Sequence, residues 1–104
     1  MVFEELSGFT RDVTRLLNDE TYAELQYALA RNPQLGKVIR GAGGLRKLRW
    51  GVPGRGKSGG VRVIYYWWDA DEVITLADIY PKNEKANLTR SEIEKLRKQI
   101  ERQD

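Results

Sequence analysis

One glycine-rich stretch, GVPGRGKSGG at residues 51–60, has the spacing of a phosphate-binding loop. Its first glycine, a gap of four residues, and then Gly56, Lys57 and Ser58 satisfy the P-loop formula, in which backbone N–H groups and the lysine bind nucleotide phosphates. Downstream of it lies VITLAD, residues 73–78, an apolar run that ends in an acid. This is the pattern of a strand whose terminal acid binds a metal ion in nucleotide hydrolases. Together these features raise the hypothesis of a nucleotide hydrolase.

The residues after the loop argue against that hypothesis. A P-loop opens a helix whose N-terminus faces the phosphates, but here Gly59 and Gly60 lead into VRVIYYWW, residues 61–68. Paired glycines and β-branched or aromatic residues disfavour a helix and favour a strand. The flanking strands are close in sequence, which favours an antiparallel hairpin over the crossover of a parallel sheet. We therefore expect Asp78 to be a strand-end or loop carboxylate and not a magnesium ligand.

Positive charge is concentrated in the middle of the chain. The formal net charge is +3, yet residues 25–68 contain nine Lys or Arg residues and no Asp or Glu. An isolated run of charge would be an ordinary solvated surface. These cations instead alternate with strand-like apolar residues and glycine loops, so they predict a basic face that binds a polyanion.

Composition limits the class of protein. A chain of 104 residues with 40% hydrophobic and 32% charged residues suits a single domain over residues 1–104. Without cysteine or histidine it lacks thiolate and imidazole ligands, so we expect no metal and no cofactor. No apolar run approaches the roughly 20 residues that span a bilayer. The acidic N-terminus is unlike a secretory signal, so we expect a cytoplasmic protein with no membrane partner.

The elements that must position these residues indicate an α+β fold with a small, mainly antiparallel sheet. In the first half we expect a strand in VFEEL, a helix over 8–17, a second helix from 18 or 19 to about 30, and an extended segment and turn over 37–44. In the second half we expect strands over 45–50, 61–68 and 73–80, followed by a last helix. The expected N-caps are Ser7, then Asn18 or Asp19, and finally Thr89, which begins the capping box TRSE. The order is β-α-α-β-β-β-α, with two N-terminal helices packed on the sheet and a C-terminal helix.

The predicted hairpin gathers groups that bind phosphate. In the strand over 45–50, side chains alternate, so Lys47 and Arg49 share one face and Leu48 lies on the other. Arg55 and Lys57 lie in the loop between the strands. The aromatic residues at 65–68 and Tyr80 can stack on bases, although about half of them must point into the core.

Three segments of this region, at residues 32–50, 54–66 and 79–89, resemble the RelE/HigB toxin superfamily, most closely its HigB2-like branch. The combination GGLRKLR…GKSGGVRVIYY carries the resemblance. The resemblance implies a type II toxin: an endoribonuclease that cuts mRNA in the ribosomal A site and halts translation. It also implies a cognate antitoxin, usually with a helix-turn-helix domain, through which the pair binds operator DNA.

By motif, the resemblance implies catalytic roles for Lys57, Arg62, Arg49 and Lys82. It implies RNA-binding roles for Lys47, Arg46, Arg55, Tyr80 and Arg40. Many relatives carry a tyrosine in the segment after the last strand, where this chain has NEKANLT with Leu88 and no tyrosine. The identity of the general base is therefore open.

The chemistry follows from the substrate, because RNA carries its own nucleophile, the 2′-OH. The enzyme must align it with the leaving 5′ oxygen and stabilise added phosphorane charge. We expect Arg62 and Arg49 to clamp the scissile phosphate, since a guanidinium binds two oxygens. Lys57 would then protonate the leaving oxygen.

The proton acceptor has three candidates. Lys47 or Lys82 accepts a proton only if neighbouring cations make its neutral form accessible near neutral pH. Glu84 is the nearest carboxylate, but a surface ion pair is the stronger interpretation for it. The alternatives for the whole protein are a non-catalytic RNA-binding module, a co-repressor that acts with the antitoxin and, least favoured, the P-loop hydrolase.

Overall fold

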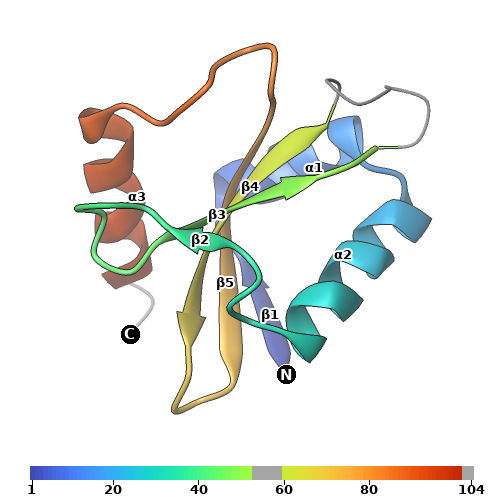
Figure 1. Ribbon diagram of the computed structural model, residues 1–104, viewed down its shortest axis with the longest axis horizontal. Coiled ribbons are helices and arrows are strands. Elements are labelled where there is room, and N and C mark those ends of the chain that lie inside the picture. The colour runs from blue at the N-terminus through green and yellow to red at the C-terminus, as the bar shows by residue number, and fades with distance from the viewer. Residues whose placement is uncertain (53–59, 102–104) are drawn as a thin grey trace.

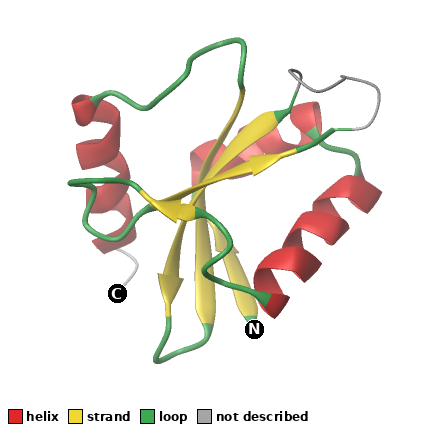
Figure 2. Ribbon diagram, in the orientation of Figure 1, coloured by secondary structure: helices red, strands yellow, loops and turns green. Residues whose placement is uncertain are grey.

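The computed structural model describes residues 1–52 and 60–101. The elements follow in the order β1 (Val2–Glu5), α1 (Ser7–Leu16), α2 (Asp19–Arg31), β2 (Lys37–Val38), β3 (Arg46–Trp50), β4 (Val61–Trp68), β5 (Val73–Pro81) and α3 (Arg90–Glu101), as Figures 1 and 2 show. The five strands form one sheet in the order β1-β5-β4-β3-β2. Only β1 pairs in parallel, with β5. The predicted α+β class is confirmed, and the two-residue strand β2 is added to the predicted order.

The sheet separates two hydrophobic clusters. On one face, Val63 and Tyr65 of β4 pack with residues of α1 and α2 such as Phe9. On the other face, Ile64 of β4 packs in a cluster with Leu96 and Ile100 of α3. This alternation along β4 follows from the period of two in a strand, and it turns Arg62 toward the α3 face. No helix in residues 1–52 and 60–101 is long and apolar enough to cross a membrane.

Helix caps match the sequence prediction in two of three cases. The Asn18 side chain accepts a hydrogen bond from the Thr21 N–H at 2.8 Å. Thr89 and Glu92 form the predicted capping box, with bonds of 2.8 and 3.1 Å. The Ser7 cap is wrong: Leu6 is the N-cap residue of α1 and no side chain caps that helix. The Leu6 N–H still bonds the Leu76 carbonyl of the sheet, so the helix begins directly where β1 pairing ends.

Replacing Thr89 with alanine should lower the free energy of unfolding by about 1 kcal/mol, because the Glu92 N–H loses its capping acceptor. Urea unfolding followed by circular dichroism measures the change. Ser91→Ala is the matched control, since Ser91 is exposed in the same helical turn. Equal stabilities of the two variants would show that the capping box contributes little.

Tyr65 holds the segment that leads into β2. Its buried hydroxyl donates to the Pro33 carbonyl at 2.7 Å and accepts from the Gly36 N–H at 2.8 Å. A Cβ at residue 36 would lie 2.8 Å from Cε1 of Tyr65, so only glycine fits there. These contacts fix β2 beside β3 and therefore help to fix the strand that carries Lys47 and Arg49.

Candidate functional site

Three predicted site residues lie in one row across the sheet. Arg49 of β3 is the register partner of Arg62 of β4, and Arg62 is the partner of Tyr80 of β5. Directly opposed residues of paired strands share a face, so these three side chains leave the sheet on the α3 side. Lys82 follows, and its N–H donates to the Gly60 carbonyl at 3.1 Å. This bond joins the end of β5 to the start of β4 and places Lys82 at the same end of the sheet.

Arg62 is a buried cation with no counterion among the described residues. The residue is 7% exposed, and its Nη1 donates to the neighbouring Val61 carbonyl at 3.4 Å. None of the ion pairs within residues 1–52 and 60–101 includes Arg62. Burying an unpaired charge is costly. Such a cation beside exposed Arg49 is suited to bind an anion that arrives from outside.

The segment between β5 and α3 is tied to the same face of the sheet. The Lys47 ammonium donates to Oδ1 of Asn87 at 2.7 Å. Lys85 pairs with Glu92 at the start of α3, and its Nζ lies 4.8 Å from the centre of the Tyr80 ring. That distance permits a cation–π interaction. Lys47 is thus held toward this segment by a hydrogen bond that it donates.

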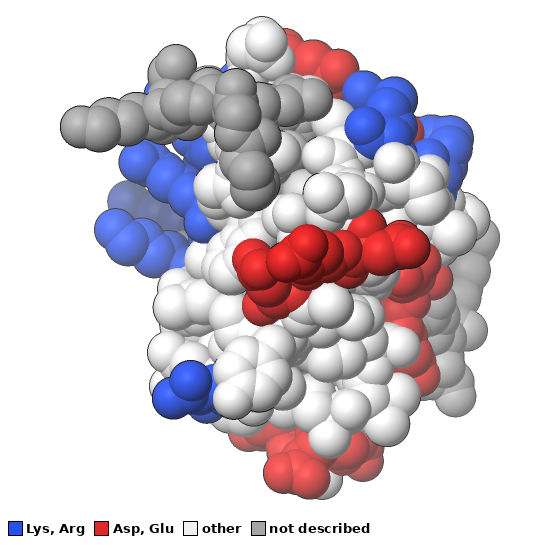
Figure 3. Space-filling model, turned by 90° about the vertical axis from the view of Figure 1, so that its right-hand side faces the viewer, with Lys and Arg blue, Asp and Glu red and all other residues white. Residues whose placement is uncertain are grey.

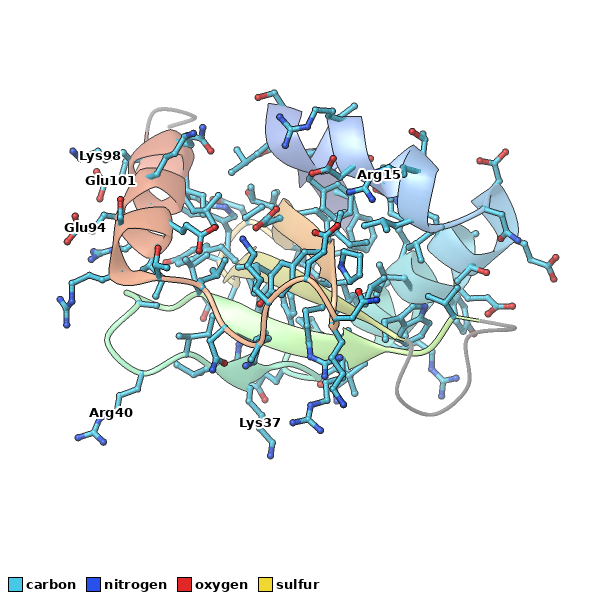
Figure 4. The ribbon with its side chains drawn as sticks, turned by 90° about the horizontal axis from the view of Figure 1, so that it is seen from above. Arg15, Lys37, Arg40, Glu94, Lys98 and Glu101 are labelled. Atoms are coloured by element: carbon cyan, nitrogen blue, oxygen red, sulfur yellow. The ribbon has the colours of Figure 1, made fainter. Side chains whose placement is uncertain are left out.

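Two predicted RNA-binding residues lie apart from this row. Arg46 alternates to the opposite face of β3, and its Nη1 donates to the Gly36 carbonyl at 2.8 Å. Arg40 is exposed and projects away from the body of the protein, as does Lys37 (Figure 4). Arg55 and Lys57 lie outside the described residues.

Charge is segregated on the surface. In Figure 3, the largest group of Lys and Arg atoms lies at the left edge of the view, with smaller groups at the upper right and lower left. Asp and Glu atoms form a band across the face that α2 presents, and the first turn of this helix contains Asp19 and Glu20. The basic edge and the acidic band agree with the basic face predicted from the sequence.

A cavity of about 310 Å³ opens beside the row, between α1, the end of β5, the segment after it and α3. Asp78 and Tyr80 both line it. Burial raises the pKa of the Asp78 carboxyl. Burial also raises the pKa of Tyr80, and the charge of Asp78 adds to this shift while Arg62 opposes it. The Tyr80 hydroxyl is buried and has no hydrogen-bond partner within the described ranges.

Asp78 lines the cavity beside the row, and sequence reasoning gave it no role in the site. It was expected at a strand end or in a loop, but it lies inside β5, which continues to Pro81. The signal was present as an acid within the apolar run VITLADIY. The carboxylate candidate Glu84 instead pairs with Nη1 of Arg15 at 3.9 Å, as the surface interpretation predicted.

The flanking strands also decide the P-loop question. β3 and β4 pair antiparallel, whereas a P-loop lies in the crossover between parallel strands. Within residues 1–52 and 60–101, no group of three or more acidic or other ligand side chains could hold a metal ion. The residues that follow the glycine-rich stretch form the strand β4, where a P-loop would be followed by a helix.

Comparison with known proteins adds a family and a fold. Residues 10–103 match the family model described as the RelE toxin of the RelE/RelB toxin–antitoxin system. The structure of a mutant of E. coli toxin RelE in the free state has a TM-score of 0.62 and 14% identity, covering 95% of this chain and 96% of that one. The intact E. coli RelBE toxin–antitoxin complex has a chain with a TM-score of 0.59 and 16% identity, covering 75% of this chain and 92% of that one. At these identities the two structures show a shared fold.

Proposed function

This chain belongs to the RelE toxin family, and from that premise we propose that it is a ribosome-dependent endoribonuclease that cleaves mRNA in the A site. The observation that carries the proposal is the row of Arg49, Arg62 and Tyr80, in which a buried arginine has no counterion within the described residues. A scissile phosphate supplies the missing anion. The face around it is basic, as binding to a polyanion requires.

In the proposed mechanism the phosphate binds between the two arginines. The guanidinium groups of Arg62 and Arg49 stabilise the charge that develops on the phosphorane oxygens. The 2′-OH attacks in line with the 5′ oxygen, Lys57 protonates that oxygen, and Lys82 adds positive charge at the end of β5. Because the substrate supplies the nucleophile and arginines supply the charge, the reaction needs no metal ion.

The proposed partners follow from the family. We propose a cognate antitoxin that forms a complex with this chain, as RelB does with RelE in the E. coli complex. An antitoxin with a helix-turn-helix domain would link the pair to operator DNA. Assignment to the HigB2-like branch, a cytoplasmic location and a single domain over the whole chain stay predictions.

Induced expression followed by mapping of 5′ ends in cellular RNA tests the proposal. We expect new ends at preferred codon positions within reading frames, and their loss from a reporter whose start codon is removed. New ends that persist without translation would contradict ribosome dependence. Retained ribosome binding without any new ends would instead favour the non-catalytic module.

Arg49→Ala should weaken binding to ribosomes programmed with mRNA. Loss of one phosphate contact should also reduce the slope of log K against log salt by about 1. Arg40→Ala is the matched control, since Arg40 is another exposed arginine that projects away from the site. Binding measured by fluorescence anisotropy between roughly 50 and 200 mM salt separates the two variants. An equal loss in both would show that the basic surface acts only through its total charge.

A further inference from the structure

We propose that Tyr80 and Asp78 form the proton-accepting arm of the cleavage site, in which the Tyr80 hydroxyl contacts the 2′-OH and passes its own proton to the Asp78 carboxylate. This inference rests on the proposed function and answers a question that the family resemblance leaves open. The chain has no histidine, and the segment after β5 has no tyrosine. Both groups of the proposed arm come instead from β5 itself.

The first argument is the state of the Tyr80 hydroxyl. Tyr80 is 3% exposed, and its hydroxyl has no hydrogen-bond partner among residues 1–52 and 60–101. A buried polar group without a partner is unusual and costs stability. A phenol can accept one hydrogen bond and donate another at the same time. The hydroxyl is not bonded to Asp78 in this structure, so in the proposed arm both of its hydrogen bonds, to the 2′-OH and to Asp78, form when substrate binds.

The second argument is position. Tyr80 is the register partner of Arg62, the proposed phosphate ligand, and it shares a cavity of about 310 Å³ with Asp78. The charges of both neighbours act on its hydroxyl. Burial is the largest effect and raises the pKa of Tyr80, Asp78 raises it further, and Arg62 lowers it. In the proposal, the ribose of a phosphate on Arg62 lies on the Tyr80 side of the row, toward the cavity that Asp78 also lines.

The third argument is that Asp78 carries no ion pair among the described residues. Its Oδ1 accepts from the Ile79 N–H at 3.0 Å. The other carboxylates that line the cavity are paired: Asp12 with Arg11 and Arg15, Glu84 with Arg15, and Glu92 with Lys85. A half-buried carboxylate without a cationic partner in a cavity is suited to accept a proton.

Several charges act on Asp78 and set the direction of its titration. Burial is the largest effect and raises its pKa, Lys85 and the Ile79 N–H lower it, and Asp12 and Glu92 raise it. The hydrogen bond and charge of Asp12 do most to raise the pKa of Arg11 on α1, and the charge of Asp78 adds the smallest contribution. The net direction is upward, which moves the carboxylate toward the pH range in which a general base is effective.

The proposed step conserves atoms and charge. The 2′-OH gives its proton to the Tyr80 oxygen while the Tyr80 proton moves to Asp78. The 2′ oxygen forms a bond to phosphorus, and the bond from phosphorus to the 5′ oxygen breaks. The 5′ oxygen leaves with a proton from Lys57, the general acid named in the proposed mechanism. The products are a 2′,3′-cyclic phosphate and a 5′-hydroxyl, and the proton on Asp78 returns to solvent.

Cleavage rates on ribosomes programmed with mRNA, measured from about pH 5 to 9, test the arm. Loss of a general base typically costs about 100-fold or more, so we expect this loss in Asp78→Asn and Tyr80→Phe. The parent rate should rise with pH as Asp78 loses its proton, and this rise should vanish in Asp78→Asn. Glu84→Gln is the control, because it changes an ion-paired carboxylate of the same cavity and should keep both the rate and the profile.

A modified substrate separates the base from the acid. A 5′-bridging phosphorothiolate has a leaving group that needs no proton, so Asp78→Asn and Tyr80→Phe should remain slow on it. Tyr80→Phe removes a hydroxyl that has no partner among the described residues, so it should keep the parent melting temperature. It therefore tests the arm even if Asp78→Asn fails to fold. Parent-like rates and pH profiles in both variants would overturn the arm. Failure of the parent chain to cleave would overturn the proposed function instead.

Discussion

Replacing Arg62 with methionine is expected to lower ribosome-dependent cleavage by about 100- to 1,000-fold, the loss typical of removing one preorganised donor to a transition state. The same change should leave the free energy of unfolding unchanged or higher. Arg62 is 7% exposed and has no ion pair within the described residues, so methionine removes an uncompensated charge while keeping much of the volume. A residue that harms stability and is required for activity is the mark of a functional site.

Arg46→Met is the matched control for Arg62→Met. Arg46 lies on the same hairpin, but its guanidinium donates to the Gly36 carbonyl at 2.8 Å on the opposite face. Its loss should cost about 1 kcal/mol of stability and leave cleavage within a few-fold of the parent. Urea unfolding and single-turnover cleavage on programmed ribosomes give both quantities. If Arg62→Met is the destabilised variant and still cleaves, Arg62 is a structural residue and the proposed phosphate site is wrong.

Gly60→Ala should be the most damaging change among the described glycines of the hairpin connection. A Cβ at residue 60 would lie 2.6 Å from the Trp50 carbonyl oxygen, so the backbone must move. Crowding of this kind costs about 1–3 kcal/mol. The Gly60 carbonyl also accepts the Lys82 N–H, so the shift displaces both Lys82 and the start of β4. A displacement of about 1 Å can lower the rate about 100-fold, and we expect a loss of that order.

Gly51→Ala provides the comparison for Gly60→Ala. A Cβ at residue 51 has no neighbour within 4 Å, so stability and cleavage should stay near the parent values. The two glycines lie at opposite ends of the same connection, and each variant changes one of them to alanine. The general effect of removing a glycine is therefore common to both variants and cancels when they are compared. Similar losses in the two variants would place the sensitivity in glycine flexibility and not in the contact with Trp50.

The sequence predicted most of the fold because local pattern and tertiary structure agree there. The run VRVIYYWW is rich in β-branched and aromatic residues, and β4 spans the same residues, Val61–Trp68. The start of α1 was misplaced by one residue because Leu6 is held by sheet pairing and burial, which no local pattern encodes. The strand β2 has two residues and is fixed by contacts with Tyr65, far away in the sequence.

The site was predictable wherever alternation decides it. Alternation within β3 put Lys47 and Arg49 on one face, and it also places Arg46 on the other. The register that joins Arg49, Arg62 and Tyr80 depends on pairing between strands and could not be read from the sequence. Asp78 was given no role because its partial burial, and the absence of an ion pair to it within the described part of the chain, arise from how α1 and α3 flank the end of β5.

The chemistry of the cut ends tests the central claim most directly. The purified chain is incubated with programmed ribosomes and with the same mRNA free in solution, and the new RNA termini are identified. Attack by the 2′-OH predicts a cut in the A-site codon with a 2′,3′-cyclic phosphate and a 5′-hydroxyl, and little cutting of free mRNA. Termini with a 5′-phosphate would show that water is the nucleophile, and intact mRNA on ribosomes would show that the chain is no ribonuclease; either result would contradict the proposed function.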